Sequence, residues 1–233
     1  MPSRASGVNH LSMEKIENVL LATMLSDRAR GDDVQVMRLN LPSGPLQEEH
    51  GEWVYFPVDA LISWVPTHSM QAAVALVGHR GCVLLPSAQS APVQVHVVSP
   101  GHVYRLDWTL VRQNPSRFAS WLWRTTSAAQ SLIGQLAQWS FCAQHHSPSQ
   151  RLASWLLHGL AQSPKPELLL RLQSLPRGMQ DWLNSSDAVG AQAIKDQGYI
   201  VKDGCLRTTN PVQLLNQACT CHASMPHPNS APL

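Results

Sequence analysis

The sequence predicts an α+β protein in which a β-rich N-terminal module is joined through one long helix to a C-terminal module with the pattern of a helix-turn-helix and a β-wing. Three observations support this. Short β-rich runs fill residues 34–106, a stretch without proline extends from Ser116 to Gln144, and a hairpin signal follows two short helical patterns near the end of the chain. We therefore expect a loose N-terminus (1–12), a β-rich domain (13–113), a long helix (114–146), a winged domain (147–222) and a disordered tail (223–233).

The composition fits two modest domains and a subunit interface. The chain has 233 residues, of which 44% are hydrophobic and only 14% charged, and it contains 8 Trp. A charged fraction well below the usual value of about a quarter, together with abundant Trp, predicts that apolar surface is covered between subunits. The net charge of +2 gives no overall basic field that would indicate nucleic acid.

The cysteines and the apolar runs predict a protein of the cytoplasm. Five cysteines are scattered along the chain, and the N-terminus lacks the pattern of a signal peptide, so we expect reduced thiols rather than a disulfide framework. No apolar run approaches the roughly 20 residues that span a bilayer, so no membrane partner is expected.

The N-terminal module begins with a short helical pattern. Apolar residues in Met13–Met24 are spaced as on one face of an amphipathic helix. From Val34 to Leu106 the pattern changes to short runs such as VQVMRLNL, EWVYFP and VQVHVV, separated by Gly, Pro, Ser and Asp. Several short strands at near-regular spacing predict a small sandwich or barrel.

The long helix carries an apolar stripe with the spacing of a coiled coil. Pro115 suits the start of a helix, and the residues from Ser116 to about Gln144 contain a single glycine. Apolar or small residues then alternate in steps of four and three, which is a 3.5-residue repeat over more than three heptads. We predict a homodimer along this stripe; the alternative is a long helix packed on its own sandwich. The predicted interface residues are Phe118, Leu122, Thr125, Ala129, Leu132, Leu136, Trp139 and Ala143.

The C-terminal module follows with further helix and hairpin signals. Ser147–Gln150 has the pattern of a capping box with proline at the first helical position, and Ser163–Pro166 ends that helix. Short helices are expected near Pro176–Leu183 and over Ser186–Gln197. The tripeptide Lys202-Asp203-Gly204 lies between two β-rich runs and predicts a hairpin.

Four segments in this order resemble the Crp/Fnr family of bacterial transcription regulators: VYFPVDALISWV, VALVGHRG, FCAQHHSPSQRLASWLL and ACTCH. The resemblance covers the chain from Asn18 to His222. It implies an N-terminal cyclic-nucleotide-binding-like β-roll (jelly roll), a long coiled-coil dimerisation helix and a C-terminal winged helix-turn-helix. It also implies a homodimer in which the roll senses a signal and the long helices pass it to paired DNA-binding domains, with double-stranded DNA as partner and RNA polymerase as a candidate partner.

The expected sensor region departs from the nucleotide-binding members of that family. Those members use a Gly-Glu pair for the ribose and an arginine for the phosphate, whereas the matching segment Gly81–Val97 contains neither an acid nor an arginine. A cyclic phosphate needs a cationic or amide-rich partner, and Arg80 is the one nearby cation. Iron–sulfur members need several grouped cysteines, whereas the first cysteine here is Cys82. We therefore expect neither a cyclic nucleotide nor an iron–sulfur cluster.

Haem and zinc have weak candidate ligands. Cys219-Thr220-Cys221-His222 has one residue between its cysteines where zinc sites usually have two or more, and Cys205 is a candidate third thiolate. The pair His145-His146 is expected to cap the long helix. Haem through a His–Cys pair stays open, although a lone histidine is more often a surface or hydrogen-bonded residue. We predict that the chain binds no cofactor. The histidines of the β-rich module are His68, His79, His96 and His102.

The predicted recognition helix is poorly charged. It opens with Asp187, and its only basic side chain, Lys195, lies near its far end. Between Pro164 and Cys221 there are six Lys/Arg and five Asp/Glu, a balance that predicts weak, shallowly salt-dependent DNA binding. The expected DNA contacts are Ser185, Ser186, Gln192, Lys195, Lys202 and Arg207.

Two functions remain open, and a third is not expected. The first is a DNA-binding transcriptional regulator of Crp/Fnr type that acts as a homodimer with an unknown effector. The second is a degenerate family member that acts as a protein-interaction or structural dimer without sequence-specific DNA binding. An enzyme is not expected, because no nucleophile–base pair, phosphate loop or closed metal constellation stands out.

Overall fold

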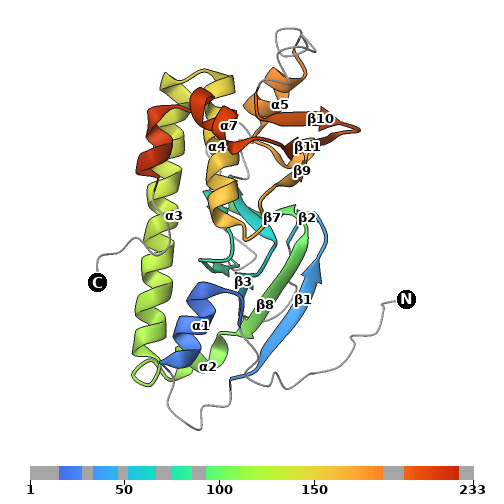
Figure 1. Cartoon of the computed structure of the whole chain (residues 1–233). Helices are drawn as coiled ribbons and strands as arrows, with labels where there is room; N and C mark the ends of the chain where they lie inside the picture. The colour runs from blue at the N-terminus through green and yellow to red at the C-terminus, as the bar shows by residue number, and fades with distance from the viewer. Residues whose placement is uncertain are drawn as a thin grey trace.

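The computed structural model describes residues 16–27, 34–46, 52–66, 75–85, 93–185 and 197–225. Figure 1 shows a two-sheet roll, the long helix α3 (Ala119–His145) along its side, and a smaller module with a β-hairpin beyond one end of the roll. The predicted α+β class is confirmed. Among the described helices, none combines the length and apolar character that crossing a membrane requires.

Two four-stranded antiparallel sheets form the roll. Their strand orders are β1-β8-β3-β6 and β2-β7-β4-β5. The inner faces supply a core in which Tyr55, Ile62 and Val97 are at most 2% exposed. The alternation of short runs and turn residues therefore produces the expected sandwich of short strands. The strands are β1 (Val36–Leu41), β2 (Gly44–Pro45), β3 (Trp53–Pro57), β4 (Leu61–Pro66), β5 (Ala75–Val77), β6 (Val83–Leu84), β7 (Val93–Ser99) and β8 (Gly101–Asp107).

Helix α1 (Val19–Ser26) closes one end of the roll. Its N-cap residue Asn18 is fully buried, and the side-chain oxygen accepts the backbone N–H three residues further on at 2.9 Å. The Asn18 amide donates to the carbonyl oxygens of Pro57 (2.8 Å) and Gly81 (3.0 Å). One side chain thus caps the helix and ties it to two segments of the roll. Of the helix predicted over Met13–Met24, the described part is helical only from Val19, because Asn18 caps it there; residues 13–15 lie outside the described part.

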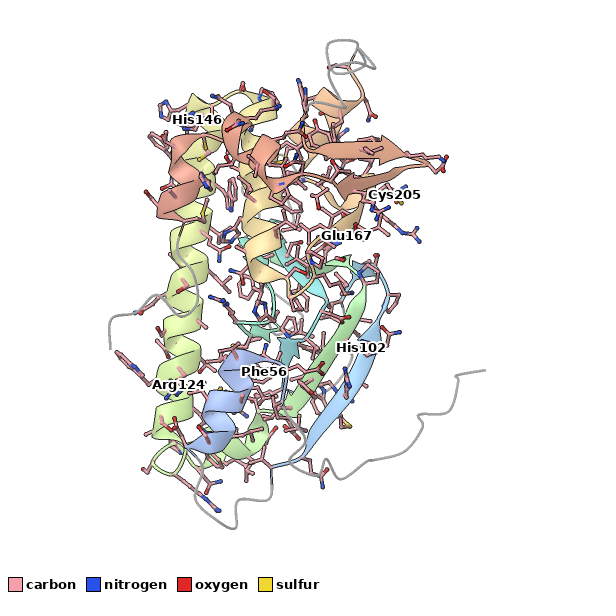
Figure 2. All side chains as sticks on the ribbon, in the orientation of Figure 1. Phe56, His102, Arg124, His146, Glu167 and Cys205 are labelled. Carbon is pink, nitrogen blue, oxygen red and sulfur yellow. The ribbon has the colours of Figure 1, made fainter. Side chains whose placement is uncertain are left out.

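One face of α3 packs on the chain itself. The short helix α2 (Thr109–Gln113) precedes it. Buried Gln135 accepts the Leu76 N–H of β5 at 3.0 Å, and Arg124 (Figure 2) forms an ion pair with Asp27 at 2.8 Å just beyond α1. The buried positions of α3 are Trp121, Thr125, Ala128, Leu132, Gln135, Trp139 and Cys142.

The predicted dimer stripe coincides with this buried face, and its assignment is corrected. Half of its members are covered by the roll and by the C-terminal module of the same chain, which is the alternative that the sequence left open. The reason is that core side chains of the roll and of that module already occupy the space beside them. The buried members are Phe118, Thr125, Leu132 and Trp139; Leu122 and Leu136 are partly buried, and Ala129 and Ala143 are exposed.

The C-terminal module combines helices with a three-stranded sheet of order β10-β11-β9. Its first helix starts with the predicted capping box: Ser147 Oγ accepts the Gln150 N–H at 3.3 Å, and Gln150 Oε1 accepts the Ser147 N–H at 3.1 Å. The elements are α4 (Pro148–Gln162), β9 (Leu169–Arg171), η1 (Leu172–Ser174), α5 (Arg177–Leu183), β10 (Tyr199–Lys202), β11 (Cys205–Thr208), α7 (Pro211–Gln217) and η2 (Thr220–Ser224).

Strands β10 and β11 form the hairpin that the sequence predicts. Lys202 pairs with Cys205, and the two turn residues Asp203 and Gly204 have φ angles of 51° and 72°. Positive φ at both central positions matches the right-handed twist of the strands, and an Asp-Gly pair tolerates it. The helix predicted over Ser186–Gln197 lies outside the described residues, apart from Gln197.

The described end of the chain packs against the module. η2 extends to Ser224, and Met225 is 3% exposed within the core of the module. The ordered chain therefore continues past the predicted boundary at His222, because Met225 supplies an apolar side chain to that core. Residues 226–233 of the predicted tail lie outside the described part.

The roll and the C-terminal module share a core. Leu61 and Leu76 of the roll belong to the same cluster of buried side chains as Trp155 of α4. At the end of α4 the Gln162 carbonyl accepts the His79 N–H at 3.0 Å and lies 2.8 Å from His79 Nδ1. Because these contacts are buried and close, a displacement of one module should also displace the other.

Asp59 adds an ion pair between the two modules. Its Oδ2 lies 2.9 Å from Nζ of Lys165, which follows α4. Its Oδ1 accepts the His102 backbone N–H and lies 3.3 Å from His102 Nδ1. Burial alone would raise the pKa of Asp59, but the His102 hydrogen bond and the Lys165 ammonium outweigh it and hold that pKa below its ordinary value.

We expect Asp59→Asn to lower the free energy of unfolding at neutral pH and to lose this effect in acid. A carboxylate whose pKa is lowered by folding stabilises the fold above about pH 4, and this contribution disappears as the pH falls through the folded-state pKa. The free energy of unfolding measured in urea should therefore be lower in the variant than in the wild type by about 1 kcal/mol at pH 7 and by much less at about pH 3. An equal difference at both pH values would contradict the proposed role of the charge.

Candidate metal centre and nucleic-acid interface

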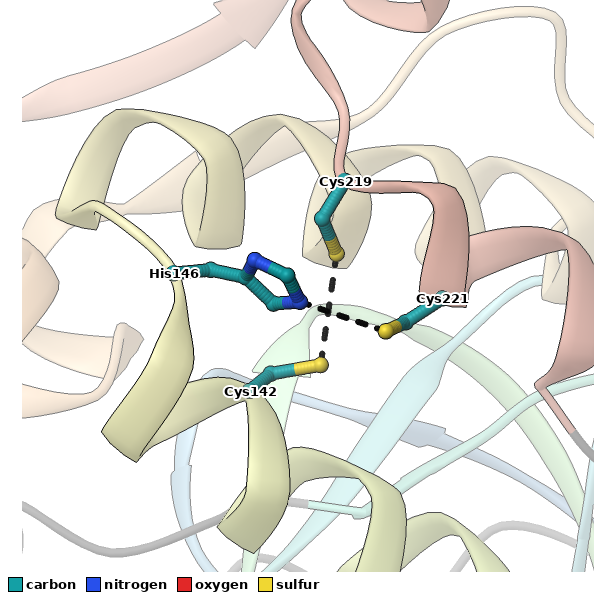
Figure 3. Close-up of side chains that lie close together, drawn as sticks. All are labelled: Cys142, His146, Cys219 and Cys221. Carbon is teal, nitrogen blue, oxygen red and sulfur yellow. Dashed lines mark hydrogen bonds between the residues drawn. The ribbon is translucent and has the colours of Figure 1, made fainter.

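Four side chains able to bind a metal meet where α3 ends. Cys142 and His146 lie one helical turn apart, and Cys219 and Cys221 belong to the segment around the start of η2 (Figure 3). Cys142 Sγ lies 3.9 Å from Cys219 Sγ, and His146 Nε2 lies 3.2 Å from Cys221 Sγ. The four ligand atoms all lie within 4.8 Å of one another. Distances of this size fit ligands of one ion.

Local structure brings these side chains together. Cys142 and His146 share a face of α3 because residues four apart are neighbours on a helix, and the His146 N–H donates to the Cys142 carbonyl at 3.1 Å. Cys219 is held by the fully buried Ser154 of α4, whose Oγ accepts the Cys219 N–H at 3.0 Å and lies 3.1 Å from its Sγ. The cluster therefore joins three segments: the end of α3, the middle of α4 and the chain after α7.

The cluster is enclosed on one side. Cys142 and Cys219 are buried, whereas Cys221 and His146 are partly exposed. Burial raises the pKa of the Cys142 thiol to about 12, although a hydrogen bond from Gln138 (3.7 Å) acts in the opposite direction. Thiolates at such a place require a nearby positive charge. Three cysteines and one histidine form a donor set that suits a soft or borderline cation.

The prediction that the chain binds no cofactor is corrected by this cluster, which could hold a metal ion. The sequence identified Cys219 and Cys221 as candidate metal ligands, but it grouped them with the wrong further ligands. Cys205 lies on β11 and is not part of the cluster, and His222 directs its Nδ1 to the Cys219 carbonyl at 3.2 Å. The cysteine spacing alone looked unsuitable because the remaining ligands come from a different helix.

The two ligands that sequence reasoning missed carry a recognisable signal. Cys142 and His146 are spaced i, i+4, the spacing that places two ligands on one face of a helix. His146 is the C-cap of α3, and its neighbour His145 packs beside Phe141 with ring centroids 4.3 Å apart. Because the pair His145-His146 was predicted to cap the helix, His146 was not predicted as a metal ligand.

The candidate sensor ligands of the roll that the structure describes pack in its core or contact other side chains and backbone groups of the chain. Cys82 is 2% exposed in the core beneath α1, and burial raises the pKa of its thiol to about 12. A buried, neutral thiol of this kind packs as a small apolar side chain. Of the four histidines, His79, His96 and His102 contact Gln162, Gln94 and Asp59 respectively, and His68 lies outside the described residues.

The predicted DNA contacts fall into two groups. Ser186, Gln192 and Lys195 lie outside the described residues. Ser185 follows α5, and its hydroxyl donates to the Trp182 carbonyl at 2.6 Å. This hydrogen bond uses the hydroxyl proton, so the Ser185 side chain can meet a further group only as an acceptor. The Ser185 backbone N–H also donates to the Trp182 carbonyl, at 3.0 Å.

The two basic residues of the hairpin share its outer face. Lys202 and Arg207 are exposed, and Arg207 lies opposite Ile200 in the register of the hairpin. The Arg207 guanidinium donates twice to Glu167 Oε2, at 2.9 Å and 2.7 Å (Figure 2 labels Glu167). A phosphate would have to compete with this carboxylate for Arg207, whereas the described structure around Lys202 leaves its ammonium exposed.

Comparison with known proteins places the fold. No protein-family model matches the sequence, and no curated protein matches it. Among solved structures, a CooA variant from Carboxydothermus hydrogenoformans superposes with a TM-score of 0.50 at 9% identity, over 84% of this chain and 94% of that chain. A protein from Eubacterium rectale named as a transcriptional regulator of the Crp/Fnr family gives 0.47 at 10% identity, over 86% and 94%. A protein from Ruegeria pomeroyi named for cyclic nucleotide binding gives 0.44 at 20% identity, over 84% and 88%.

The match to the CooA variant agrees with the fold described above. Because the match covers most of both chains, it includes residues of both the roll and the C-terminal module. The identities are low, so the likeness concerns the path of the backbone rather than particular site residues. The chain therefore shares the overall fold of the CooA variant.

Proposed function

We propose that this protein is a DNA-binding transcriptional regulator of Crp/Fnr type that works as a homodimer. One observation carries the proposal: helix α4, strand β9, helix α5 and the hairpin β10–β11 follow one another in the order of a winged helix-turn-helix. The recognition helix that the sequence predicts, Ser186–Gln197, falls between α5 and β10 along the chain and lies outside the described residues apart from Gln197. A winged module attached to a long helix suits paired contacts to two half-sites of one duplex.

The outer face of α3 supports dimerisation. Trp123, Ile133 and Phe141 are 72%, 66% and 49% exposed. The exposed positions of α3 include no Asp, Glu, Lys or Arg, unlike the outer face of an ordinary surface helix. Seven of them alternate in steps of three and four, and this stripe is the proposed seam: Trp123, Thr126, Gln130, Ile133, Ala137, Ser140 and Gln144.

The effector is not identified by this proposal. The sequence of the segment Gly81–Val97 contains neither an acid nor an arginine. One observation favours the second candidate, a protein-interaction dimer without sequence-specific DNA binding: the wing arginine Arg207 is already engaged by Glu167. The two candidates differ in what they predict for DNA.

Fluorescence anisotropy with two duplexes tests the proposal. One duplex carries the DNA upstream of the protein's own gene, the other a scrambled sequence, and each is titrated at about 50 mM and about 200 mM salt. A regulator should bind the upstream duplex more tightly than the scrambled one. The logarithm of its binding constant should fall as the logarithm of the salt concentration rises. Feeble binding that is indifferent to sequence would favour the protein-interaction dimer.

We expect Lys202→Ala to weaken binding to both duplexes alike and to reduce the salt slope. The reason is that an exposed wing lysine contacts phosphate, which carries no sequence information, and each lost phosphate contact lowers the slope by about 1. Lys165→Ala is the matched control, because Lys165 is paired with Asp59 away from the wing; its salt slope should equal that of the wild type. A Lys202→Ala slope unchanged from wild type would remove Lys202 from the interface.

A further inference from the structure

We propose that Cys142, His146, Cys219 and Cys221 bind one Zn²⁺ ion, and that this ion fastens the C-terminal segment of the chain to the end of helix α3. The proposal goes beyond DNA binding and does not depend on it. It rests on the distances within the cluster, the donor atoms, the groups around them and the position of the cluster in the fold.

The distances within the cluster are close to those of a tetrahedral zinc site. With Zn–S bonds of about 2.3 Å and Zn–N bonds of about 2.0–2.1 Å, the edges of the tetrahedron are about 3.5–3.8 Å. The Cys142–Cys219 sulfur pair at 3.9 Å and the His146–Cys221 pair at 3.2 Å lie on either side of these values. No pair of ligand atoms is further apart than 4.8 Å. His146 and Cys221 are partly exposed, so their side chains have room to adjust when an ion binds.

The donor atoms favour zinc over other ions and over a disulfide. Calcium and magnesium take oxygen ligands, which this cluster lacks. An iron–sulfur cluster places inorganic iron and sulfide between its cysteines, and there is no room for these within 4.8 Å. The Cys142 and Cys219 sulfurs lie 3.9 Å apart, roughly twice the length of a disulfide bond. A closed Cys₃His set is typical of structural zinc, since no position stays open for a substrate.

The groups around the cluster are suited to hold thiolates. The Gln138 amide donates to Cys142 Sγ at 3.7 Å, and Ser154 Oγ lies 3.1 Å from Cys219 Sγ. Hydrogen bonds from such neighbours orient the ligands and share their negative charge. The partial exposure of His146 and Cys221 gives the ion a path from solvent, while Cys142 and Cys219 close the inner side.

The position of the cluster gives the ion a mechanical role. Cys142 and His146 end the helix that carries the proposed dimer seam, and Ser147 begins the module that carries the wing. The Cys219 N–H also donates to Ser154 Oγ at 3.0 Å, and this bond joins the chain after α7 to α4 rather than to α3. With zinc bound, four coordinate bonds fix the angle between α3 and the module.

Metal analysis of the purified full-length protein tests the proposal. We expect about one Zn²⁺ per chain by inductively coupled plasma mass spectrometry. We also expect a Co²⁺-substituted protein to show the intense visible bands of a tetrahedral ion together with thiolate charge-transfer absorption. Competition with a chromophoric chelator should show zinc affinity lowered on the order of 100-fold or more in Cys221→Ser and in His146→Ala, since each removes one ligand.

Matched controls lie on the same chain. Cys205→Ser removes a cysteine outside the cluster, and His145→Ala and His222→Ala remove histidines next to the ligands in sequence; all three should keep zinc affinity and the cobalt spectrum. Circular dichroism and chelator-dependent thermal unfolding establish that His146→Ala and Cys221→Ser are folded. The proposal is overturned if the wild type binds neither Zn²⁺ nor Co²⁺, if the ligand variants bind as tightly as the controls, or if peptide mapping under non-reducing conditions finds the cluster cysteines in a disulfide.

Discussion

Ile133→Asp is expected to convert the dimer into a monomer and to abolish DNA binding with it. Ile133 is 66% exposed near the middle of the uncharged outer face of α3. In a symmetric helix pair each copy would bury an unpaired carboxylate at the seam, at about 3–5 kcal/mol for each charge. The dimer dissociation constant should rise by more than two orders of magnitude. Sedimentation or light scattering at micromolar concentration measures the change.

Two variants control this experiment. Val212 on α7 is also 66% exposed, so Val212→Asp adds the same charge to a surface away from the seam and should leave the dimer intact. Leu132, the neighbour of Ile133, is 6% exposed in the core of the roll. Leu132→Asp should therefore lower the melting temperature of the fold rather than act on association alone. A dimer that withstands Ile133→Asp would show that copies meet through another surface.

The contrast between Leu132 and Ile133 shows how far the sequence could predict the long helix. Its length, its start near Pro115 and its 3.5-residue repeat are all visible in the sequence. Two stripes with this repeat lie one residue apart, which is about 100° around the helix. The more apolar stripe was assigned to the dimer, but the roll of the same chain covers it. Periodicity identifies the stripes and contains no information about which neighbour each one meets.

Local signals in the C-terminal module were reliable for a physical reason. The capping box at Ser147 and the hairpin turn at Asp203-Gly204 depend on residues at most three positions apart. A backbone N–H that needs a cap, or a φ angle that needs glycine, is determined by the immediate chain. These elements were therefore predictable without any knowledge of the fold.

The metal cluster could not be predicted in the same way. Cys142 and Cys219 are separated by 77 positions in sequence, and only the packing of α7 and η2 beside α3 and α4 brings them together. The sequence analysis identified the local pair Cys219 and Cys221 but did not use the i, i+4 spacing of Cys142 and His146. Joining the two pairs required the tertiary structure.

Gly78→Ala is expected to disrupt the junction between the roll and the C-terminal module. A Cβ atom at Gly78 would lie 1.9 Å from the Gln162 carbonyl oxygen and 2.7 Å from its carbonyl carbon. Both groups are backbone, so neither can rotate away, and the end of α4 must shift. The shift would also break the contact between Gln162 and His79. Overpacking of this kind costs about 3 kcal/mol, which corresponds to a melting temperature lower by about 6–12 °C.

Gly178→Ala provides the control for this substitution, because it adds the same methyl group at a position where there is space for it. At Gly178 in α5 the nearest atom to an added Cβ is the Arg151 Nη2 at 3.8 Å, an ordinary contact. Alanine also restricts the unfolded chain, so stability should stay level or rise by up to about 1 kcal/mol. If the two variants have the same melting temperature in differential scanning calorimetry, the close contact between Gly78 and the Gln162 backbone does not hold the roll against α4. If only Gly78→Ala is destabilised and its DNA affinity changes as well, the junction carries signals between the roll and the wing.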